Sequence, residues 1–306
     1  MRRRSQVVRQ RSAKPLFAGS TPAVASNFPV PPNFAFVPTV ESHGWYQLAP
    51  FRWSRSEGVL RRKEALSEGV VDLAISFAKG KLRVRGARES AVLRARMARM
   101  FQLDVDTSEF VAQTRASSTH DWVEASGFGR LLCGSTLWED AVKIIATTNT
   151  MWRQTVRMVE LLVAKCGRDG AFPDPAEVAR FSEAELQNDC RLGYRAKSIH
   201  RLAAMFVELG DAGPEFTGTT AELFKRYQTL PGIGPYGAAH LLAMDGRHDF
   251  IAVDTEFRRF VRETYHGGRK VSDATMLRRY AKWGRWKYLA FWSELHRAWS
   301  GTAENF

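Results

Sequence analysis

Cysteine is scarce in this sequence. The 306 residues contain three, Cys133, Cys166 and Cys190, and they lie far apart. Three thiols cannot complete a four-thiolate zinc site or an iron–sulfur cluster, and they do not form the even set of a disulfide framework. We therefore expect buried, reduced thiols in an intracellular protein that requires no cofactor.

Long apolar runs are also missing. No stretch reaches the roughly 18 residues that a membrane-spanning helix needs, so we expect no membrane partner. The N-terminus lacks the apolar segment of a secretory signal. Residues 1–14 instead carry six basic residues and no acid. This composition predicts a disordered basic arm over residues 1–38, and it is also compatible with mitochondrial targeting.

Acidic residues are outnumbered by basic ones. The chain has 45 Lys and Arg against 32 Asp and Glu, a net charge of +13 and a pI of about 10.0. Removing the six charges of residues 1–14 leaves +7, so the rest of the chain is itself basic. Such a surface favours a polyanionic partner, either nucleic acid or an anionic membrane. A hydrophobic share of 44% is sufficient for a well-filled core.

Two kinds of local pattern divide the rest of the chain. Short β-like runs at 46–49, 59–60, 69–77 and 81–85 alternate with turn residues, and Gly80 predicts a hairpin turn. A helix is expected over about 87–101. Residues 39–118 are thus predicted to form a small antiparallel sheet domain with a helix.

Helical periodicity dominates residues 119–306. Thr136 is placed to cap one helix and Pro175 to open another, while Gly167 and Gly210 end two more. Further helices are expected over 219–228, 237–244, 255–264, 273–282 and 286–299. The predicted fold class is α+β, with a small N-terminal antiparallel sheet followed by a mostly helical domain.

A glycine-containing hairpin is predicted at residues 230–236. Residues 230–242 read Leu-Pro-Gly-Ile-Gly-Pro-Tyr-Gly-Ala-Ala-His-Leu-Leu, which resembles a helix–hairpin–helix. Gly232 and Gly234 allow positive φ and let phosphate approach the main chain. Main-chain N–H groups there, with those of Tyr236 and Gly237 in the next helix, would bind phosphate oxygens whatever the base sequence.

Asp254 follows this hairpin in the segment Phe250-Ile-Ala-Val-Asp-Thr. Together, hairpin and aspartate resemble the helix–hairpin–helix (HhH-GPD) DNA glycosylase superfamily. The resemblance implies that Asp254 is the catalytic carboxylate. Cleaving a nucleoside's C1′–N bond develops oxocarbenium charge, which a fixed carboxylate stabilises. From the residues alone, Asp254 could instead only cap the helix 255–264, and the two roles are compatible.

The resemblance covers roughly residues 43–299. Segments starting at Gly129, Thr136, Thr147 and Leu192 are similar to the branch that contains 3-methyladenine and oxoguanine DNA glycosylases. It implies a monomeric base excision repair enzyme that acts inside the cell on double-stranded DNA and flips out a damaged base. The four-cysteine cluster of the endonuclease III branch is absent, so no iron–sulfur cofactor is implied.

Two positions carry further implications of the resemblance. Members that also cut the strand have a Lys two residues after the second hairpin Gly, and it forms a Schiff base with the sugar. Tyr236 stands there in this chain, and a phenol cannot form an imine. This implies a monofunctional enzyme that uses water and leaves an abasic site. Asn149 stands where relatives fill the gap left by the flipped base, although its spacing alone indicates only a helix end.

Aromatic residues predict a base pocket. Tyr288 and Trp292 are four residues apart and share a helix face, and Trp138 and Trp152 are further candidates. Tyr288 stands where an oxoguanine enzyme has Gln, which argues against oxoguanine specificity. Aromatic faces favour an electron-poor alkylated purine such as 3-methyladenine. For each of these rings the alternative is a place in the hydrophobic core.

Backbone contacts complete the prediction. Three basic side chains are candidates for phosphate contacts, or else solvated surface charges: Arg195, Lys197 and Arg258. By resemblance, three backbone carbonyls would hold a K⁺ or Na⁺ ion: those of Gln228, Leu230 and Ile233. We expect a monofunctional glycosylase for alkylated purines. The alternatives are an oxoguanine-type glycosylase and a catalytically silent DNA-binding protein.

Overall fold

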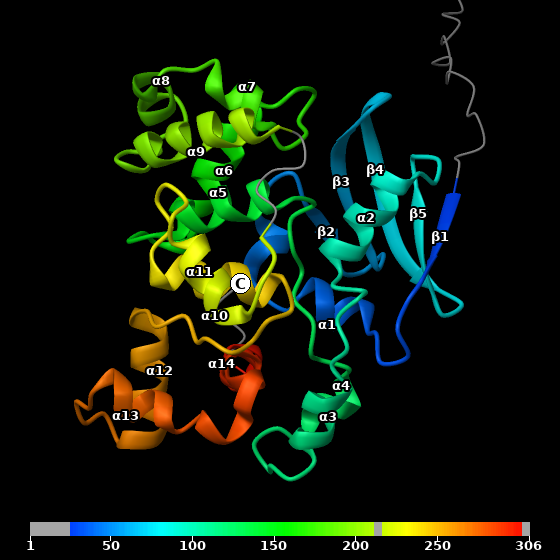
Figure 1. Ribbon diagram of the computed structural model, residues 1–306. Helices are drawn as coiled ribbons and strands as arrows, with labels where there is room; N and C mark the ends of the chain where they lie inside the picture. The colour runs from blue at the N-terminus through cyan, green and yellow to red at the C-terminus, as the bar shows by residue number, and fades with distance from the viewer. Residues whose placement is uncertain (1–24, 211–215, 302–306) are drawn as a thin grey trace, which may run out of the picture.

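A five-stranded antiparallel sheet lies beside a mostly helical body (Figure 1). The computed structural model describes residues 25–210 and 216–301. The arrangement confirms the predicted α+β fold, with the sheet first in the chain and the helices after it. Residues 1–24 of the predicted basic arm lie outside the described residues.

The sheet has the strand order β1-β5-β4-β3-β2. Its strands are β1 (Ala25–Pro29), β2 (Arg52–Ser54), β3 (Val59–Leu66), β4 (Gly69–Ala78) and β5 (Lys81–Arg85). Lys79 and Gly80 have φ values of 53° and 70°. Two successive positive φ values are typical of the tightest hairpin turn, so the turn predicted at Gly80 is confirmed.

The extent of the predicted arm is wrong for residues 25–38. Strand β1 pairs with β5, where Phe28 lies opposite Leu82, and helix α1 begins at Phe36. Phe28 is buried, so this segment contributes to the core. Pro29 obscured the strand in the sequence, but a proline is tolerated because it ends an edge strand.

The strand predicted at residues 46–49 is also wrong. This segment overlaps the 3₁₀ helix η1 (Gly44–Gln47) and continues to Ala49 without joining the sheet. Trp45 turns into the core from η1 and is 6% exposed. Aromatic residues have a high strand propensity, but burial of this ring against the helices decides the local conformation.

Helices form most of the remaining described chain. They are α1 (Phe36–Val40), α2 (Ala91–Met100), α3 (Ser108–Thr114), α4 (Trp122–Ser126), α5 (Leu137–Thr147), α6 (Trp152–Cys166), α7 (Pro175–Ala179), α8 (Glu183–Asn188), α9 (Arg195–Leu209), α10 (Thr220–Tyr227), α11 (Pro235–Met244), α12 (Thr255–His266), α13 (Asp273–Arg278), the 3₁₀ helix η2 (Ala281–Trp286) and α14 (Lys287–Gly301). Local caps set several starts, as when Thr136 accepts the Glu139 amide at 3.1 Å. No helix among these described residues is long and apolar enough to cross a membrane.

Hydrophobic packing joins the sheet to the helices. One core runs from Leu73 of β4 through Met97 of α2 to Leu242 of α11, and a second lies among α12, η2 and α14. A small cluster that includes Ala239 and Tyr288 lies between α11 and α14. Early and late segments of the described chain therefore meet around α11, and a cavity lies there.

Candidate active site

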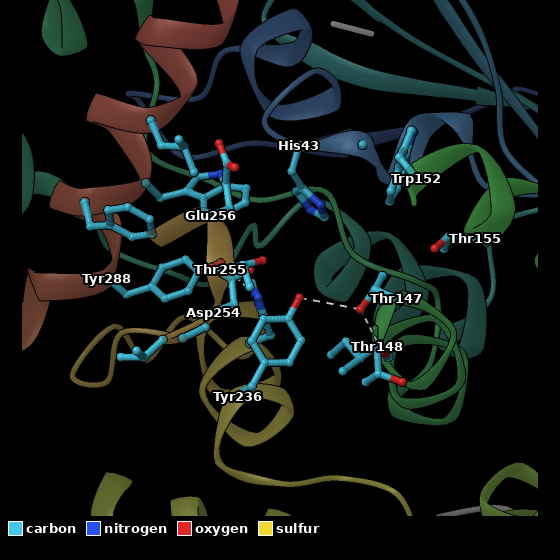
Figure 2. A pocket seen from close by; sticks show the side chains of 18 of the residues that line it. His43, Thr147, Thr148, Trp152, Thr155, Tyr236, Asp254, Thr255, Glu256 and Tyr288 are labelled. Carbon is cyan, nitrogen blue, oxygen red and sulfur yellow. Dashed lines mark hydrogen bonds between the residues drawn. The ribbon is translucent and has the colours of Figure 1, made fainter. Parts of the chain in front are cut away.

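A cavity of about 840 Å³ lies where several segments meet (Figure 2). Its walls come from the loop entering η1, the α5–α6 loop, the first turns of α11, the start of α12, and one face of α14. This volume is in the range of small-molecule pockets. The cavity is therefore large enough to hold a single nucleobase.

Asp254 lies in the wall of this cavity and also caps α12. Its Oδ1 accepts the Phe257 amide at 2.7 Å, which fixes the side chain. Burial raises the pKa of Asp254 above its usual range, although the amide hydrogen bond acts in the opposite direction. Asp254 thus caps α12 and also faces the cavity, and its catalytic role stays a prediction.

The predicted hairpin connects α10 to α11. Gly232 has φ of +83°, and a Cβ there would lie 2.6 Å from the Cβ of Ser198 on α9, so only glycine fits. Gly234 is the N-cap of α11, and the space around its Cα is open. This leaves the hairpin main chain accessible from outside. Gly237 is buried against Ile144 of α5, so helix packing explains its small size, and a phosphate contact by its amide stays a prediction.

Tyr236 points into the cavity from the first turn of α11 (Figure 2). Its hydroxyl lies 3.5 Å from Oγ1 of Thr147 at the end of α5. Burial raises the pKa of Tyr236 to about 12, so the phenol is neutral at physiological pH. Tyr236 and Asp254 line the same cavity. The Tyr236 side chain therefore faces this cavity, and only the main-chain amide of Tyr236 is left for a contact outside it.

Two aromatic side chains of α14 form one wall. The rings of Tyr288 and Trp292 stack with centroids 5.7 Å apart and planes 13° apart. The Trp292 indole donates to the Ser42 carbonyl at 2.9 Å, and the Tyr288 hydroxyl bonds Nδ1 of His240 at 2.8 Å. These bonds hold both rings in place. The structure brings these two predicted pocket residues to the cavity together.

Of the other two predicted pocket residues, Trp152 and Trp138, one lines the cavity and the other is in the core. Trp152 lines the cavity, and its indole donates to Gln47 at 2.7 Å. Trp138 does not line it. Trp138 is 4% exposed, donates to the Pro173 carbonyl at 2.8 Å and packs on Phe206. Its placement in the pocket was wrong, because its helix face turns toward α9 and not toward α11.

Asn149 lies at the cavity rim, in the loop between α5 and α6. It is exposed and has a left-handed φ of 47°, a conformation that asparagine tolerates better than most residues. Met151 and Tyr194 beside it are 65% and 63% exposed. The Tyr194 hydroxyl accepts from the Asn149 amide at 3.4 Å. An exposed loop tip thus lies at the rim of the cavity.

Arg195 supports this loop and does not present its charge to solvent. Its guanidinium donates to the carbonyls of Thr148, Asn149 and Leu192, and the residue is 7% exposed. The predicted phosphate contact is therefore corrected to a structural role. Sequence could not separate the two, because both need an arginine near the loop.

The remaining predicted backbone contacts stay predictions. Lys197 is exposed on α9. Arg258 lines the cavity rim but forms two 2.8 Å hydrogen bonds with Asp273, so that pair must open before Arg258 binds phosphate. In the hairpin, the Leu230 carbonyl accepts the Ile233 amide at 3.0 Å. A monovalent ion that also binds the carbonyl of Gln228 would have to share the Leu230 oxygen with this amide.

Several cavity residues could not be predicted from the sequence, among them two histidines and a tryptophan. His43, Trp45 and His240 all line the cavity. Burial lowers the pKa of His43 to about 3 and that of His240 to about 4, so both imidazoles are neutral. Isolated histidines in a sequence have no periodic or motif signal. Nothing indicated that His43 and Trp45, so far from the hairpin in the sequence, would return to it.

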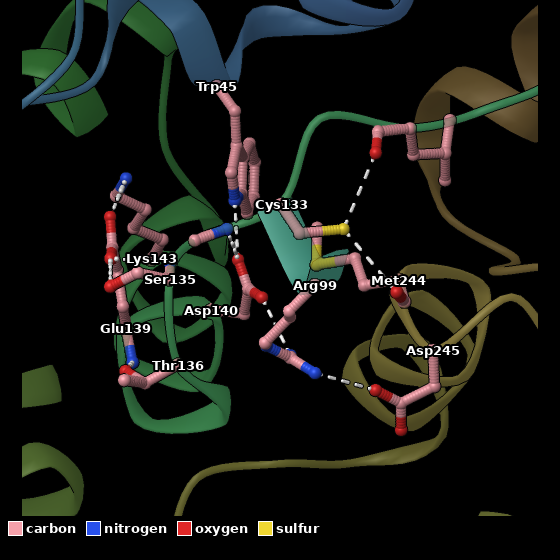
Figure 3. Close-up of polar contacts among 12 residues, drawn as sticks. Trp45, Arg99, Cys133, Ser135, Thr136, Glu139, Asp140, Lys143, Met244 and Asp245 are labelled. Carbon is pink, nitrogen blue, oxygen red and sulfur yellow. Dashed lines mark hydrogen bonds and ion pairs between the residues drawn. The ribbon is translucent and has the colours of Figure 1, made fainter. Parts of the chain in front are cut away.

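A buried polar network holds Trp45 in the wall (Figure 3). The Trp45 indole donates to Oδ1 of Asp140 at 2.9 Å, and Arg99 bridges Asp140 and Asp245 at 2.8 and 2.9 Å. Asp245 is the C-cap of α11, the helix that follows the hairpin. One chain of charges thus links the cavity wall to the hairpin helix.

A hairpin beside a cavity that is lined by a helix-capping aspartate is the arrangement that the resemblance to helix–hairpin–helix DNA glycosylases implies. The family model described as "HhH-GPD superfamily base excision DNA repair protein" matches residues 142–285. Residues 142–285, which include the hairpin and Asp254, thus match this superfamily. No curated protein sequence matches the chain.

Several solved structures share the fold. The 3-methyladenine DNA-glycosylase from Archaeoglobus fulgidus has a TM-score of 0.70 and 17% identity, over 90% of this chain and 99% of that one. MBOgg1 in complex with a low affinity DNA ligand has a TM-score of 0.69 and 19% identity, over 92% and 98%. A Clostridium acetobutylicum 8-oxoguanine glycosylase/lyase bound to DNA has 0.67 and 17%, over 88% and 93%. At these identities the likeness shows the fold alone.

Proposed function

We propose that this protein is a monofunctional DNA glycosylase that removes a flipped, alkylated purine such as 3-methyladenine from duplex DNA. The observation that carries the proposal is the position of Asp254. Its carboxylate is fixed in the wall of a cavity that can hold a base and that Tyr236 of the hairpin helix and the stacked rings of Tyr288 and Trp292 also line. Hydrolysis then leaves an abasic site for later repair.

The reaction needs one fixed negative charge. As the C1′–N bond breaks, the base leaves with the bonding electron pair and the sugar gains oxocarbenium character. Asp254 stabilises that positive charge and orients a water molecule, whose oxygen bonds to C1′. A positively charged alkylated purine leaves as a neutral base, so the proton released from water passes to solvent. The Phe257 amide holds Asp254 in place, so no reorganisation is needed during the step.

The absence of an amine at the reacting centre supports the monofunctional assignment. Strand cleavage through a Schiff base needs a nucleophilic nitrogen near C1′. Tyr236 stands at the position from which that group would act, and its phenol stays neutral. Within residues 25–210 and 216–301, no lysine lines the cavity. Water is therefore the nucleophile in this proposal.

The charges around the cavity favour a cationic lesion. Both lining arginines are engaged in ion pairs, Arg258 with Asp273 at 2.8 Å and Arg259 with Glu256 at 2.5 Å. The lining histidines are neutral, and Asp254 adds negative charge. A purine alkylated at a ring nitrogen is positively charged in DNA and stacks well on electron-rich rings. An uncharged oxidised purine gains less from this environment.

Contacts with the duplex are proposed at the hairpin and at Asn149. The accessible main chain at Gly232 and Gly234 suits a phosphate, as does Lys197 nearby in the fold. Asn149 at the rim is placed to enter the gap left by the extruded base. Flipping costs a few kcal/mol, which such a filling residue partly offsets.

The test uses duplexes that carry 3-methyladenine, hypoxanthine or 8-oxoguanine. We expect strand breaks at the alkylated base only after alkali, and no complex trapped by borohydride. Asp254→Asn should abolish excision while retaining DNA affinity, because asparagine caps a helix as well as aspartate does. The matched control is Asp174→Asn, which changes an N-cap aspartate at α7 outside the cavity.

Each outcome separates the alternatives. Excision of 8-oxoguanine in preference to 3-methyladenine would favour the oxoguanine-type reading, and trapping by borohydride would refute the monofunctional one. DNA binding with no excision of any lesion would leave a silent binding protein. Full activity of Asp254→Asn would show that another group stabilises the sugar.

A further inference from the structure

The loop before η1 places His43 in the cavity wall, opposite Tyr236 and Asp254 (Figure 2). This loop is anchored at the two residues that precede His43. Ser42 accepts the Leu132 amide at 3.0 Å through its hydroxyl and the Trp292 indole at 2.9 Å through its carbonyl. The carbonyl of Glu41 is bonded by His296 at 3.0 Å. These hydrogen bonds hold the loop that carries His43 in place. The loop lies far from the hairpin in the sequence.

The tautomer of His43 is set by its neighbour. Its Nε2 lies 2.7 Å from the Leu132 carbonyl oxygen, which can only accept, so Nε2 carries the proton. The ring is neutral because burial strongly disfavours its charge. Nδ1 is then a bare acceptor. Trp45 and Trp292 confine the ring, with centroids 4.7 and 6.2 Å away.

We infer that His43 is a specificity-determining residue, whose Nδ1 accepts a hydrogen bond from an N–H group of the extruded purine. This inference rests on the proposed function and names how the same cavity reads its substrate. The exocyclic amine of an alkylated adenine is a suitable donor. Its N–H bonds are polarised by the positive charge of the alkylated ring, which strengthens a hydrogen bond to a neutral acceptor.

Two amide substitutions separate this role from a purely structural one. Asparagine places its amide near the position of Nδ1, and glutamine places its amide near the position of Nε2. If Nδ1 reads the base, His43→Asn retains more activity than His43→Gln. If His43 only anchors the loop to Leu132, the order is reversed. His43→Phe keeps the ring volume and removes both nitrogens.

The matched control is a second histidine that contacts the same loop. His296 also bonds a carbonyl of this loop, that of Glu41, but it does not line the cavity. His296→Phe therefore loses a similar anchoring bond without changing the cavity wall. We expect it to excise at close to the wild-type rate.

The measurement is the single-turnover rate of 3-methyladenine excision, with affinity for undamaged duplex measured in parallel. We expect His43→Phe to lose roughly 10- to 100-fold in rate, the usual effect of one hydrogen bond to a charged group, with unchanged duplex affinity. His43→Asn should recover part of that loss. A loss under threefold for His43→Phe, or better recovery by His43→Gln, overturns the inference. Failure of the wild type to excise any purine instead overturns the proposed function.

Discussion

The carboxylate of Asp140 is the polar centre that joins the cavity wall to the hairpin helix (Figure 3). It is 0% exposed and accepts three donors, the Gly134 amide at 2.7 Å, the Trp45 indole at 2.9 Å and the Arg99 guanidinium at 2.8 Å. We predict that Asp140→Asn lowers the free energy of unfolding by about 3 kcal/mol.

This magnitude follows from what an amide cannot do. One amide oxygen must serve donors that two carboxylate oxygens served before, and the amide NH₂ adds a donor where no acceptor was needed. Removing one partner of a buried ion pair costs roughly 3–5 kcal/mol. Arg99 is 22% exposed and keeps Asp245 as a partner at 2.9 Å. The remaining pair places the loss at the lower end of that range.

Urea unfolding followed by tryptophan fluorescence measures this change. A loss of about 3 kcal/mol corresponds to a melting temperature lower by about 6 °C, at roughly 2 °C per kcal/mol for a chain of this size. The control is Asp121→Asn, which breaks a pair with Arg297 whose side chains are 66% and 53% exposed, and it should change stability little. Equal losses in the two variants would refute the reasoning.

Three further predictions concern the cavity. Because burial raises the pKa of Asp254, the single-turnover excision rate should be highest at neutral pH, where the carboxylate is ionised. The rate should fall as the pH drops through that raised pKa and the carboxylate is protonated. An acid limb of the single-turnover rate at or below the ordinary aspartate pKa contradicts this. Tyr236→Lys places an amine in the cavity beside Asp254, so it should gain a borohydride-trapped complex that the wild type lacks; no trapping would place residue 236 away from the sugar. In Gly44→Ala the new Cβ would overlap the ring of Trp152, so we expect roughly tenfold slower excision and a loss of about 1–3 kcal/mol in urea unfolding. Wild-type values in both assays would show that the ring moves freely.

The hairpin and the capping aspartate were predictable because their signals are local. Gly232 needs a positive φ within its own turn, and Asp254 bonds an amide three residues later. The helix boundaries set by Thr136 and Asp174 follow from the same short-range hydrogen bonds. Such interactions form between neighbours in the chain, so the sequence pattern contains them whatever the rest of the fold does.

Two assignments failed because residues with the same chemistry can face either way. Trp138 and Trp152 were equivalent as aromatic pocket candidates, yet one packs into the core and the other lines the cavity. Arg195 had the charge for a phosphate contact, but the carbonyls of the α5–α6 loop take its donors. Which face a helix buries depends on the elements packed against it, and periodicity does not name those elements.

The sequence by itself determined the hairpin at residues 230–236, the position of Asp254 in the chain and the order of sheet and helices. Each of these depends on backbone conformation and on hydrogen bonds between residues a few positions apart. Only the tertiary structure decided what surrounds that carboxylate. His43 reaches the cavity from a loop held by Leu132 and by Trp292 of α14, elements distant in the chain. Long-range packing forms the pocket, because its walls come together only when the loop at His43 and helix α14 pack beside α11.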